Sequence, residues 1–285
     1  MSRTSTDAVD AEPPVKRRRL SEHESHTARL RPAIPLEPLL DPSGVAVDVG
    51  GCAGFCVLRG PQWCSDAAAV YDELGSAAAD RLSWTALRDG GNPNDLSDTV
   101  KAYCGDDGML SRGGRYKRQL LVRGRRAEAL LSLPHLMGAR RSVLSSVESL
   151  VGAAAEAHGE PSPAVTLLTE QLIRYLPSDR WFAPHYDKDR RDKTHAPLDP
   201  KTYDGPGDAL ATLCLGCACT ILMLPRTGYE AAAAAAGGRP FCIELRPGDV
   251  YVLHGAARWE WLHGISVADD VETARRVVVW RVLLN

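Results

Sequence analysis

The chain has 285 residues, of which 44% are hydrophobic and 25% are charged, and its formal net charge is −2 at pH 7. This composition is ordinary for a globular protein with a sizeable core, and it excludes a chain that binds nucleic acid through a strongly basic surface overall. No apolar run approaches the roughly 20 residues that a membrane helix needs, so the sequence predicts a soluble protein without a membrane partner. The N-terminus lacks an apolar signal core and the eight cysteines are scattered, which indicates reduced thiols in the nucleus or cytosol.

Residues 1–35 carry few large apolar side chains, and we expect them to form a disordered tail. Within this tail, "PPVKRRRL" contains a compact basic run made by Lys16, Arg17, Arg18 and Arg19. The run is typical of a nuclear import signal, which predicts a nuclear protein that contacts the import machinery, with the cytoplasm as a second location. The alternative is a solvated cluster of charges in a tail.

Residues 36–163 show a mixed pattern of strands and helices. Apolar and β-branched residues with interspersed glycines predict strands in "GVAVDVGGCAGFCVLRG". The segment "SDAAAVYDELGSAAADRL" predicts a helix with Ser65 as its N-cap, and "ARRSVLSSVESLVGAAAEAHG" predicts a second helix that Gly159 closes.

From residue 164 onward, apolar runs joined by Pro/Gly turns predict at least four strands. They are "AVTLLTEQLIRYL", "ATLCLGCACTILML", "PFCIELRPGDVYVLHG" and "ARRVVVWRVLLN". Because no regular helices separate them, the pattern favours a sandwich or a barrel. The low-complexity run "EAAAAAAGGRP" is interpreted as a loop insertion between two strands.

The stretch "FAPHYDKD" places His185, Asp187 and Asp189 at alternate positions, which share one face if the stretch is a strand. His185 and Asp187 together leave a metal ion under-coordinated, and His263 in "RPGDVYVLHGAARWEWLHGIS" is the candidate third ligand. Two histidines and one carboxylate form the facial triad of non-haem Fe(II) oxygenases, which leaves positions open for a co-substrate and dioxygen.

Arg275 and Arg281 lie six residues apart in "ARRVVVWRVLLN", and so share a strand face with Val277 and Val279. An arginine that points into an apolar barrel is costly unless it meets an anion, and a dicarboxylate such as 2-oxoglutarate supplies one. The rival for this role is the neighbouring Arg276, which this alternation places on the opposite face.

H-x-D, a distant histidine and then R-x5-R together resemble the pattern of the AlkB-like 2-oxoglutarate/Fe(II)-dependent dioxygenases, most closely over residues 165–285. The resemblance implies an α+β fold with a mostly β core, a double-stranded β-helix (jelly roll) with flanking N-terminal helices and a substrate lid. Three parts are then expected: a tail over 1–35, an α/β extension with the lid over 36–163, and the catalytic core over 164–285.

The same resemblance implies an iron site formed by His185, Asp187 and His263, with 2-oxoglutarate and dioxygen as co-substrates. It implies that Arg275 binds the distal carboxylate of 2-oxoglutarate and that Arg281 lies near its other end.

Two further positions carry expectations from the family. Tyr175 stands where the family keeps the tyrosine of an N-x-Y motif that hydrogen-bonds the co-substrate, but Ile173 replaces the asparagine. Asp189 stands where the family contacts the damaged base, and its alternative is a solvated loop carboxylate. The implied activity is oxidative demethylation of alkylated nucleobases, as in DNA repair.

Residues 111–126 combine seven basic side chains with one tyrosine. Such a mixture suits phosphate contacts and base stacking, so we expect nucleic-acid contacts from Arg115, Tyr116, Lys117 and Arg118. The alternative is a solvated loop.

Other interpretations stay open at this point. One is a 2-oxoglutarate-dependent hydroxylase of a protein or small molecule, and another is a jelly-roll module that binds a partner without catalysis. Cys214, Cys217 and Cys219 invite a zinc site, but no fourth ligand has the right spacing, so buried thiols are favoured. His254 is interpreted as a strand-end residue, and nothing supports His195 as a ligand. We expect a monomer.

Overall fold

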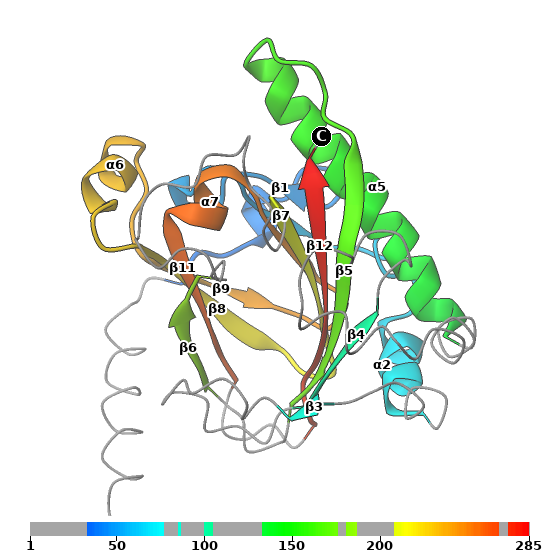
Figure 1. The fold of residues 1–285 in the computed structure, drawn as a ribbon. Helices are drawn as coiled ribbons and strands as arrows, with labels where there is room; N and C mark the ends of the chain where they lie inside the picture. Colours follow the sequence, from blue (N-terminus) through cyan, green and yellow to red (C-terminus); the bar gives the residue numbers. More distant parts are fainter. Residues whose placement is uncertain are drawn as a thin grey trace, which may run out of the picture. The chain divides into compact units, whose positions relative to one another are not determined.

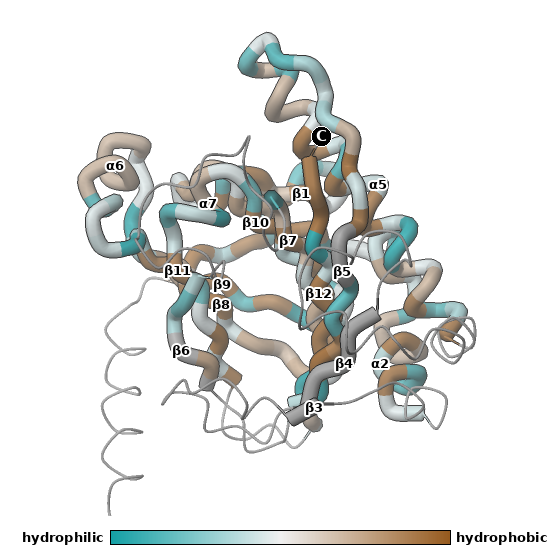
Figure 2. Tube along the Cα trace, in the orientation of Figure 1, coloured by the Kyte–Doolittle hydropathy of each residue, from teal (hydrophilic) through white to brown (hydrophobic). Residues whose placement is uncertain are grey.

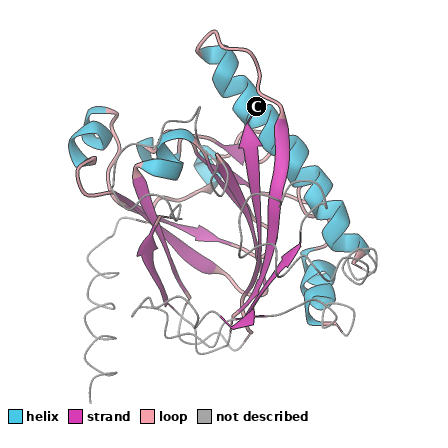
Figure 3. Cartoon of the chain, viewed as in Figure 1, coloured by secondary structure: helices cyan, strands magenta, loops and turns pink. Residues whose placement is uncertain are grey.

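The computed structural model describes part of the compact unit Ala33–Asn285, and the account below concerns these residues alone. They are 33–76, 85–86, 100–104, 133–175, 181–186, 208–267 and 273–284. Figure 3 shows strands at the centre of this unit and helices around them. Within these ranges, no helix is both long and apolar enough to cross a membrane.

The strands form two sheets, in which every pairing between neighbouring strands is antiparallel (Figure 1). The large sheet has eight strands in the order β1-β2-β10-β7-β12-β5-β4-β3, and the small sheet has four in the order β6-β11-β8-β9. In the first half of the chain the strands are β1 Val45–Ala46, β2 Phe55–Leu58, β3 Thr85–Ala86, β4 Val100–Cys104, β5 Val165–Arg174 and β6 Trp181–His185. In the second half they are β7 Ala209–Leu215, β8 Cys219–Pro225, β9 Phe241–Leu245, β10 Val250–Leu253, β11 Trp261–Ser266 and β12 Arg276–Leu284.

The central strands of the large sheet are buried on both faces. On β12, Val278 and Trp280 pack with the helices, whereas Val277 and Val279 pack toward the small sheet. This explains the continuous apolar runs of the sequence, which antiparallel strands lack when one face is solvated. Figure 2 shows the resulting hydrophobic colouring along β7 and β12. The expectation of a β-rich α+β fold is confirmed.

Two helices, α2 Ala67–Gly75 and α5 Pro134–Ala157, cover the outer face of the large sheet (Figure 1). The N-cap of α2 is Asp66, whose carboxylate accepts a hydrogen bond from the Ala69 N–H at 2.8 Å, so the expectation of Ser65 was wrong. Asp66 caps the helix as well as Ser65 would, and its negative charge also interacts favourably with the positive end of the helix dipole.

Helix α5 begins at Pro134, earlier than the sequence pattern indicated. Its N-cap Leu133 provides no side-chain hydrogen bond. Instead, the Glu73 carboxylate of α2 accepts hydrogen bonds from the backbone N–H groups of His135 at 2.9 Å and Leu136 at 2.8 Å. The start of α5 is therefore set by a residue far away in the sequence, which no local pattern reveals.

Two expectations about the second half of the chain are corrected. The run "ATLCLGCACTILML" is two strands, because Gly216 at φ +88° turns the chain from β7 in the large sheet to β8 in the small sheet. A Cβ at Gly216 would lie 2.5 Å from the Ala274 carbonyl oxygen, so this corner requires glycine. The alanine run forms a short helix, α6 Glu230–Ala235, rather than a structureless loop; alanine is the strongest helix former. A further short helix, α7 Gly255–Trp259, precedes β11.

The segment before β1 lies along the edge of the small sheet. Ala33 forms a parallel bridge with Cys242 of β9, and the Ile34 N–H donates to the Cys242 carbonyl oxygen at 2.8 Å. A short 3-10 helix, η1 Glu37–Leu39, follows. Ala33 and Ile34, which the sequence analysis placed in a disordered tail, are thus paired with the sheet.

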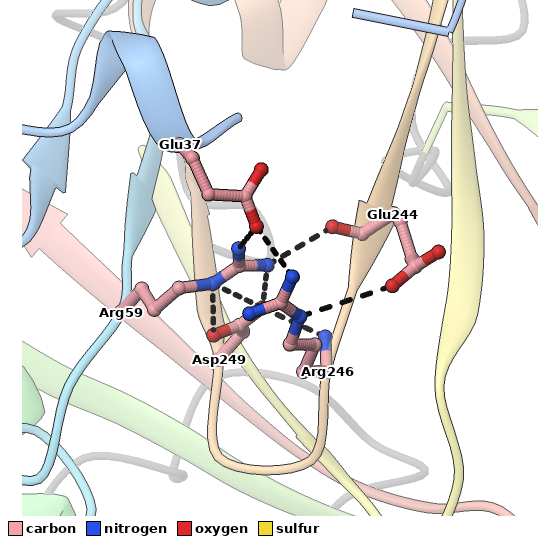
Figure 4. A network of polar contacts seen from close by, with 5 residues as sticks. All are labelled: Glu37, Arg59, Glu244, Arg246 and Asp249. Atoms are coloured by element: carbon pink, nitrogen blue, oxygen red, sulfur yellow. Dashed lines mark hydrogen bonds and ion pairs between the residues drawn. The ribbon is translucent and has the colours of Figure 1, made fainter. Parts of the chain in front are cut away.

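A polar network anchors this segment to the turn between β9 and β10 (Figure 4). The Arg59 guanidinium donates to both Asp249 carboxylate oxygens, with contacts of 3.0, 3.1 and 2.6 Å. Asp249 also accepts from the Arg246 backbone N–H at 2.7 Å, and Glu37 pairs with both Arg59 and Arg246. The Asp249 side chain is 3% exposed and that of Glu37 is 55% exposed, so Asp249 is the energetically important partner.

Replacing Asp249 with alanine is expected to lower the free energy of unfolding by about 3 kcal/mol, because the Arg59 guanidinium loses its buried partner. Equilibrium unfolding in urea measures this loss. Glu37→Gln is the matched control, since it removes a charge from the same arginine on the solvent side and is expected to shift the urea midpoint far less. Equal effects of the two substitutions would contradict the prediction.

Candidate metal and anion-binding site

His185 and His263 lie directly opposite each other on the paired strands β6 and β11 of the small sheet. Their ring centroids are 4.4 Å apart and their planes differ by 48°. His263 shares a strand face with Trp261 and Ile265, which pack in the cluster between the two sheets, and it is 7% exposed. The Tyr251 ring of the large sheet lies 6.4 Å from it. The imidazole pair therefore faces the interior between the sheets.

The spacing of the two imidazoles fits a shared metal ion. A divalent metal such as zinc binds imidazole nitrogen at about 2.0–2.1 Å, so two imidazoles about 90° apart around one ion have centroids about 4.5 Å apart. The observed distance is 4.4 Å. Phe182, on the same strand as His185, meets the His185 ring edge-on at 4.6 Å and restricts its orientation.

The expected third ligand, Asp187, lies outside the described residues, as does Asp189. Strand β6 ends at His185, and the described chain stops at Tyr186, one residue before Asp187. Among the described residues, no cluster of three or more His, Cys, Asp or Glu side chains has the geometry to hold a metal ion. The structure thus describes two of the three predicted ligands, His185 and His263, and the predicted carboxylate follows directly after Tyr186 in the sequence.

Arg275 is a buried cation just before β12, with 5% of its surface exposed. Its guanidinium carbon lies 4.8 Å from the centre of the Tyr175 ring, and its carbonyl oxygen accepts from the Tyr175 N–H at 2.9 Å. Its Nε is buried, and no hydrogen-bond partner for it occurs in the described part of the chain. A buried guanidinium that lacks a partner atom in this way is suited to bind an anion.

In the described part of the chain, the groups that shift the pKa of Arg275 most are thiols and phenols rather than carboxylates. Burial lowers the pKa of Arg275, but interactions with Cys219, Tyr175, Cys214 and Tyr251 outweigh this effect and raise the pKa above its usual value, so the guanidinium stays charged. Burial raises the pKa of both Tyr175 and Tyr251, and these phenols are therefore neutral near pH 7. Arg275 therefore provides a fixed positive charge, with neutral phenols near it.

Among the described neighbours of Arg275, Cys219 has a pKa near neutrality. A hydrogen bond from Cys214 and the charge of Arg275 together lower the pKa of Cys219 to about 7, against the opposing effect of burial. The same hydrogen bond, together with burial, raises the pKa of Cys214. Cys214, Cys217 and Cys219 all lie in the apolar cluster between the sheets.

Arg276 points to the opposite face of β12, away from Arg275. It stacks on the Tyr71 ring of α2 at 3.8 Å and donates to the Tyr71 carbonyl oxygen. Arg281 is half-buried, and its guanidinium donates to the Gln171 side-chain oxygen at 3.4 Å. The alternation of β12 thus separates the two neighbouring arginines as the spacing argument expected, with Arg275 toward the small sheet.

A row of rings connects Arg275 to the histidine pair. From the guanidinium, the Tyr175 ring is 4.8 Å away; Tyr175 meets Phe182 at 6.4 Å, Phe182 meets His185 at 4.6 Å, and His185 meets His263 at 4.4 Å. The structure therefore brings together four of the predicted site residues, which come from separate parts of the chain. Ile173, at the family's asparagine position, is buried in the same cluster.

Sequence reasoning missed several residues that line this site. Tyr251 lies inward on β10, and Cys219 lies against Arg275. Phe182 contacts both Tyr175 and His185. In "PGDVYVLHG", Tyr251 and Leu253 are two residues apart and so share one face of a strand, which was a signal that Tyr251 points inward. The position of Cys219, in contrast, depends on the corner at Gly216.

Other candidates are either placed elsewhere or outside the described residues. His254 directly follows β10 and is the N-cap of α7; its Nε2 lies 3.9 Å from the Cys56 sulfur, and burial lowers its pKa. The remaining predicted positions lie outside the described residues: Arg115, Tyr116, Lys117, Arg118 and His195, and the basic run Lys16, Arg17, Arg18 and Arg19.

Comparisons with known proteins give only a distant likeness. No protein-family model matches the chain, and no curated protein matches it. Solved structures do match, among them one titled "The structure of OsALKBH1", with 14% sequence identity and a TM-score of 0.44. The match covers 80% of this chain and 97% of that chain.

Proposed function

We propose that this chain is an Fe(II)- and 2-oxoglutarate-dependent dioxygenase built on a double-stranded β-helix. The observation that carries the proposal is the row from the buried Arg275 to the opposed imidazoles of His185 and His263. Two opposed imidazoles, a buried guanidinium and, in the sequence, a carboxylate two residues after His185 are the parts that such a reaction requires.

The donor set suits ferrous iron. His185, His263 and Asp187 would hold the ion, which leaves positions for 2-oxoglutarate and dioxygen. When bound, Fe(II) supplies the activation of dioxygen that couples oxidative decarboxylation of 2-oxoglutarate to oxidation of a C–H bond. Phe182 restricts the His185 ring, and His263 is buried beside the apolar cluster between the sheets.

The protein groups near Arg275 position the co-substrate. The Arg275 guanidinium would bind the distal carboxylate, with its unpaired Nε as one donor. The neutral phenols of Tyr175 and Tyr251 are donors and do not repel the carboxylate, because burial raises their pKa. Arg281, held by Gln171, would lie near the other end of the co-substrate.

The substrate we propose is an alkylated nucleobase in DNA or RNA. Hydroxylation of an N-methyl carbon gives an N–CH2–OH group, which releases formaldehyde and leaves the N–H base, so the net reaction is demethylation. Support comes from the sequence: the basic stretch 111–126 around Tyr116, the import-like run, and Asp189 beside the ligand stretch. A nuclear location, a monomeric state and the division at residues 35 and 163 are further parts of this proposal.

Turnover of 2-oxoglutarate tests the proposal. The purified chain is loaded with Fe(II) and 2-oxoglutarate without oxygen and then exposed to air, and succinate and formaldehyde are measured. We expect succinate formation that a chelator abolishes and that methylated single-stranded DNA or RNA increases, with formaldehyde in equal amount. Absence of succinate under every condition would overturn the dioxygenase, whereas succinate without formaldehyde from either nucleic acid would overturn the substrate alone.

A further inference from the structure

Arg226 makes three contacts at the end of the small sheet where the metal-ligand residues lie. It directly follows β8, and its backbone N–H donates to the Glu260 carbonyl oxygen at 2.7 Å. Its guanidinium donates to the Trp259 carbonyl oxygen at 3.3 Å and lies 4.0 Å from the centre of the Tyr186 ring. Arg226 is half-buried, and the Tyr229 ring lies farther away at 5.8 Å.

The partners of Arg226 belong to the two segments that carry the predicted ligands. Tyr186 stands between His185 and Asp187 in the sequence, and Trp259 and Glu260 close α7 just before β11, which carries His263. In the small sheet β11 lies between β6 and β8, so β6 and β8 share no ladder. Arg226 therefore reaches from the end of β8 across the start of β11 to the end of β6.

The end of β6 pairs with a neighbouring strand on one side, through its ladder to β11. Strand β6 is at the edge of the small sheet, and its ladder to β11 shifts register between His263 and Ile265. A strand that pairs on one side and has an irregular ladder opens more easily than a central strand. A cation stacked on the residue directly after His185 restricts this movement.

We propose that Arg226 is a positioning residue that fixes the ends of β6 and β11 relative to each other and so holds His185 against His263. The inference rests on the proposed function for its metal, but the contacts that carry it do not involve the metal. Arginine suits this task because its planar guanidinium stacks on an aromatic face while its edge donates hydrogen bonds; a lysine ammonium cannot do both.

The test compares substitutions on both sides of the stack. Arg226→Leu and Tyr186→Leu each remove the cation–ring contact, whereas Tyr186→Phe retains a ring face for the guanidinium. Arg226→Lys keeps the positive charge, but a lysine cannot both stack on the Tyr186 ring and donate to the Trp259 carbonyl oxygen. Arg239→Ala, an exposed arginine in the same connection between β8 and β9, is the control.

Two measurements are made on the metal-free protein. The first is the affinity for Mn(II), a redox-stable probe, by titration calorimetry. The second is amide hydrogen exchange of residues 181–186 and 261–266. Both leucine variants are expected to bind Mn(II) about 10–100-fold more weakly and to exchange faster in these strands, because loss of an outer partner of a metal site has effects of this size. Tyr186→Phe and Arg239→Ala are expected to match the wild type.

Unchanged exchange and unchanged Mn(II) affinity in Arg226→Leu would overturn the inference. If Arg226→Leu does not fold, the same two measurements on Arg226→Lys, Tyr186→Leu and Tyr186→Phe test the inference, and unchanged values in Arg226→Lys and Tyr186→Leu would overturn it. If the wild-type protein binds no Mn(II), the proposed function fails, and the exchange measurement alone then supports or overturns the positioning role of Arg226.

Discussion

Alanine in place of His263 is expected to abolish metal binding and, with it, all succinate formation. The ring centroids of His263 and His185 are 4.4 Å apart. With alanine at position 263, only His185 and Asp187 of the three proposed ligands would remain. Loss of an outer partner alone weakens metal sites about 10–100-fold, so loss of a direct ligand is expected to exceed 100-fold. Calorimetric titration with Mn(II) and the succinate assay measure the two effects.

The matched control for this substitution is His158→Ala. His158 is the exposed C-cap residue of α5, on the far side of the large sheet from the imidazole pair. His185→Ala is expected to behave as His263→Ala, and the double variant is expected to be no worse, because residues that act as one unit are not additive. A His263→Ala protein that is folded and forms succinate at the wild-type rate would eliminate the proposed metal centre.

Methionine in place of Arg275 is expected to remove 2-oxoglutarate binding without loss of fold stability. Truncating a desolvated charge that pairs with a ligand costs about 2–5 kcal/mol, which corresponds to a dissociation constant about 100-fold higher or more. In the free protein, however, the Arg275 Nε is buried without a described partner. An apolar side chain of similar length avoids that desolvation, so the thermal midpoint of the free protein is expected to stay equal or to rise.

Arg276→Met is the control, and it is expected to change stability rather than 2-oxoglutarate binding. Arg276 stacks on Tyr71 of α2 and has no access to the space between the sheets. We expect this variant to lose stability and to keep its affinity for 2-oxoglutarate. Ligand-induced stabilisation, measured as the shift of the thermal midpoint with 2-oxoglutarate, reports binding without turnover. An equal shift in Arg275→Met and wild type would refute the anion site.

The parts of the site that the sequence revealed are those with local periodicity. Arg275 and Arg276 differ only by strand alternation, and β12 places them on opposite faces as that rule requires. The strands β5 and β12 were recognisable from their apolar composition. The division of "ATLCLGCACTILML" into β7 and β8 was not, because both strands are apolar and the corner at Gly216 lies inside one continuous run.

Local sequence patterns do not reveal contacts between distant segments, for a physical reason. That His185 lies near His263 was expected from the metal-site pattern and the family resemblance, but their direct pairing depends on sheet register, which is set by burial and packing rather than by neighbours in the chain. The Phe182 contact with Tyr175, the Arg226 contact with Tyr186 and the capping of α5 by Glu73 are also non-local. No pattern within one segment predicts such partners.

The short segment along β9 has a consequence for solubility. An open edge of a sheet presents unpaired N–H and C=O groups that recruit strands from other molecules. Ala33 and Ile34 occupy part of that edge through Cys242, and Glu37 secures them by its pairing with Arg59 and Arg246. A fragment trimmed at residue 40 would lose this cover, and self-association through β9 would then compete with the native state.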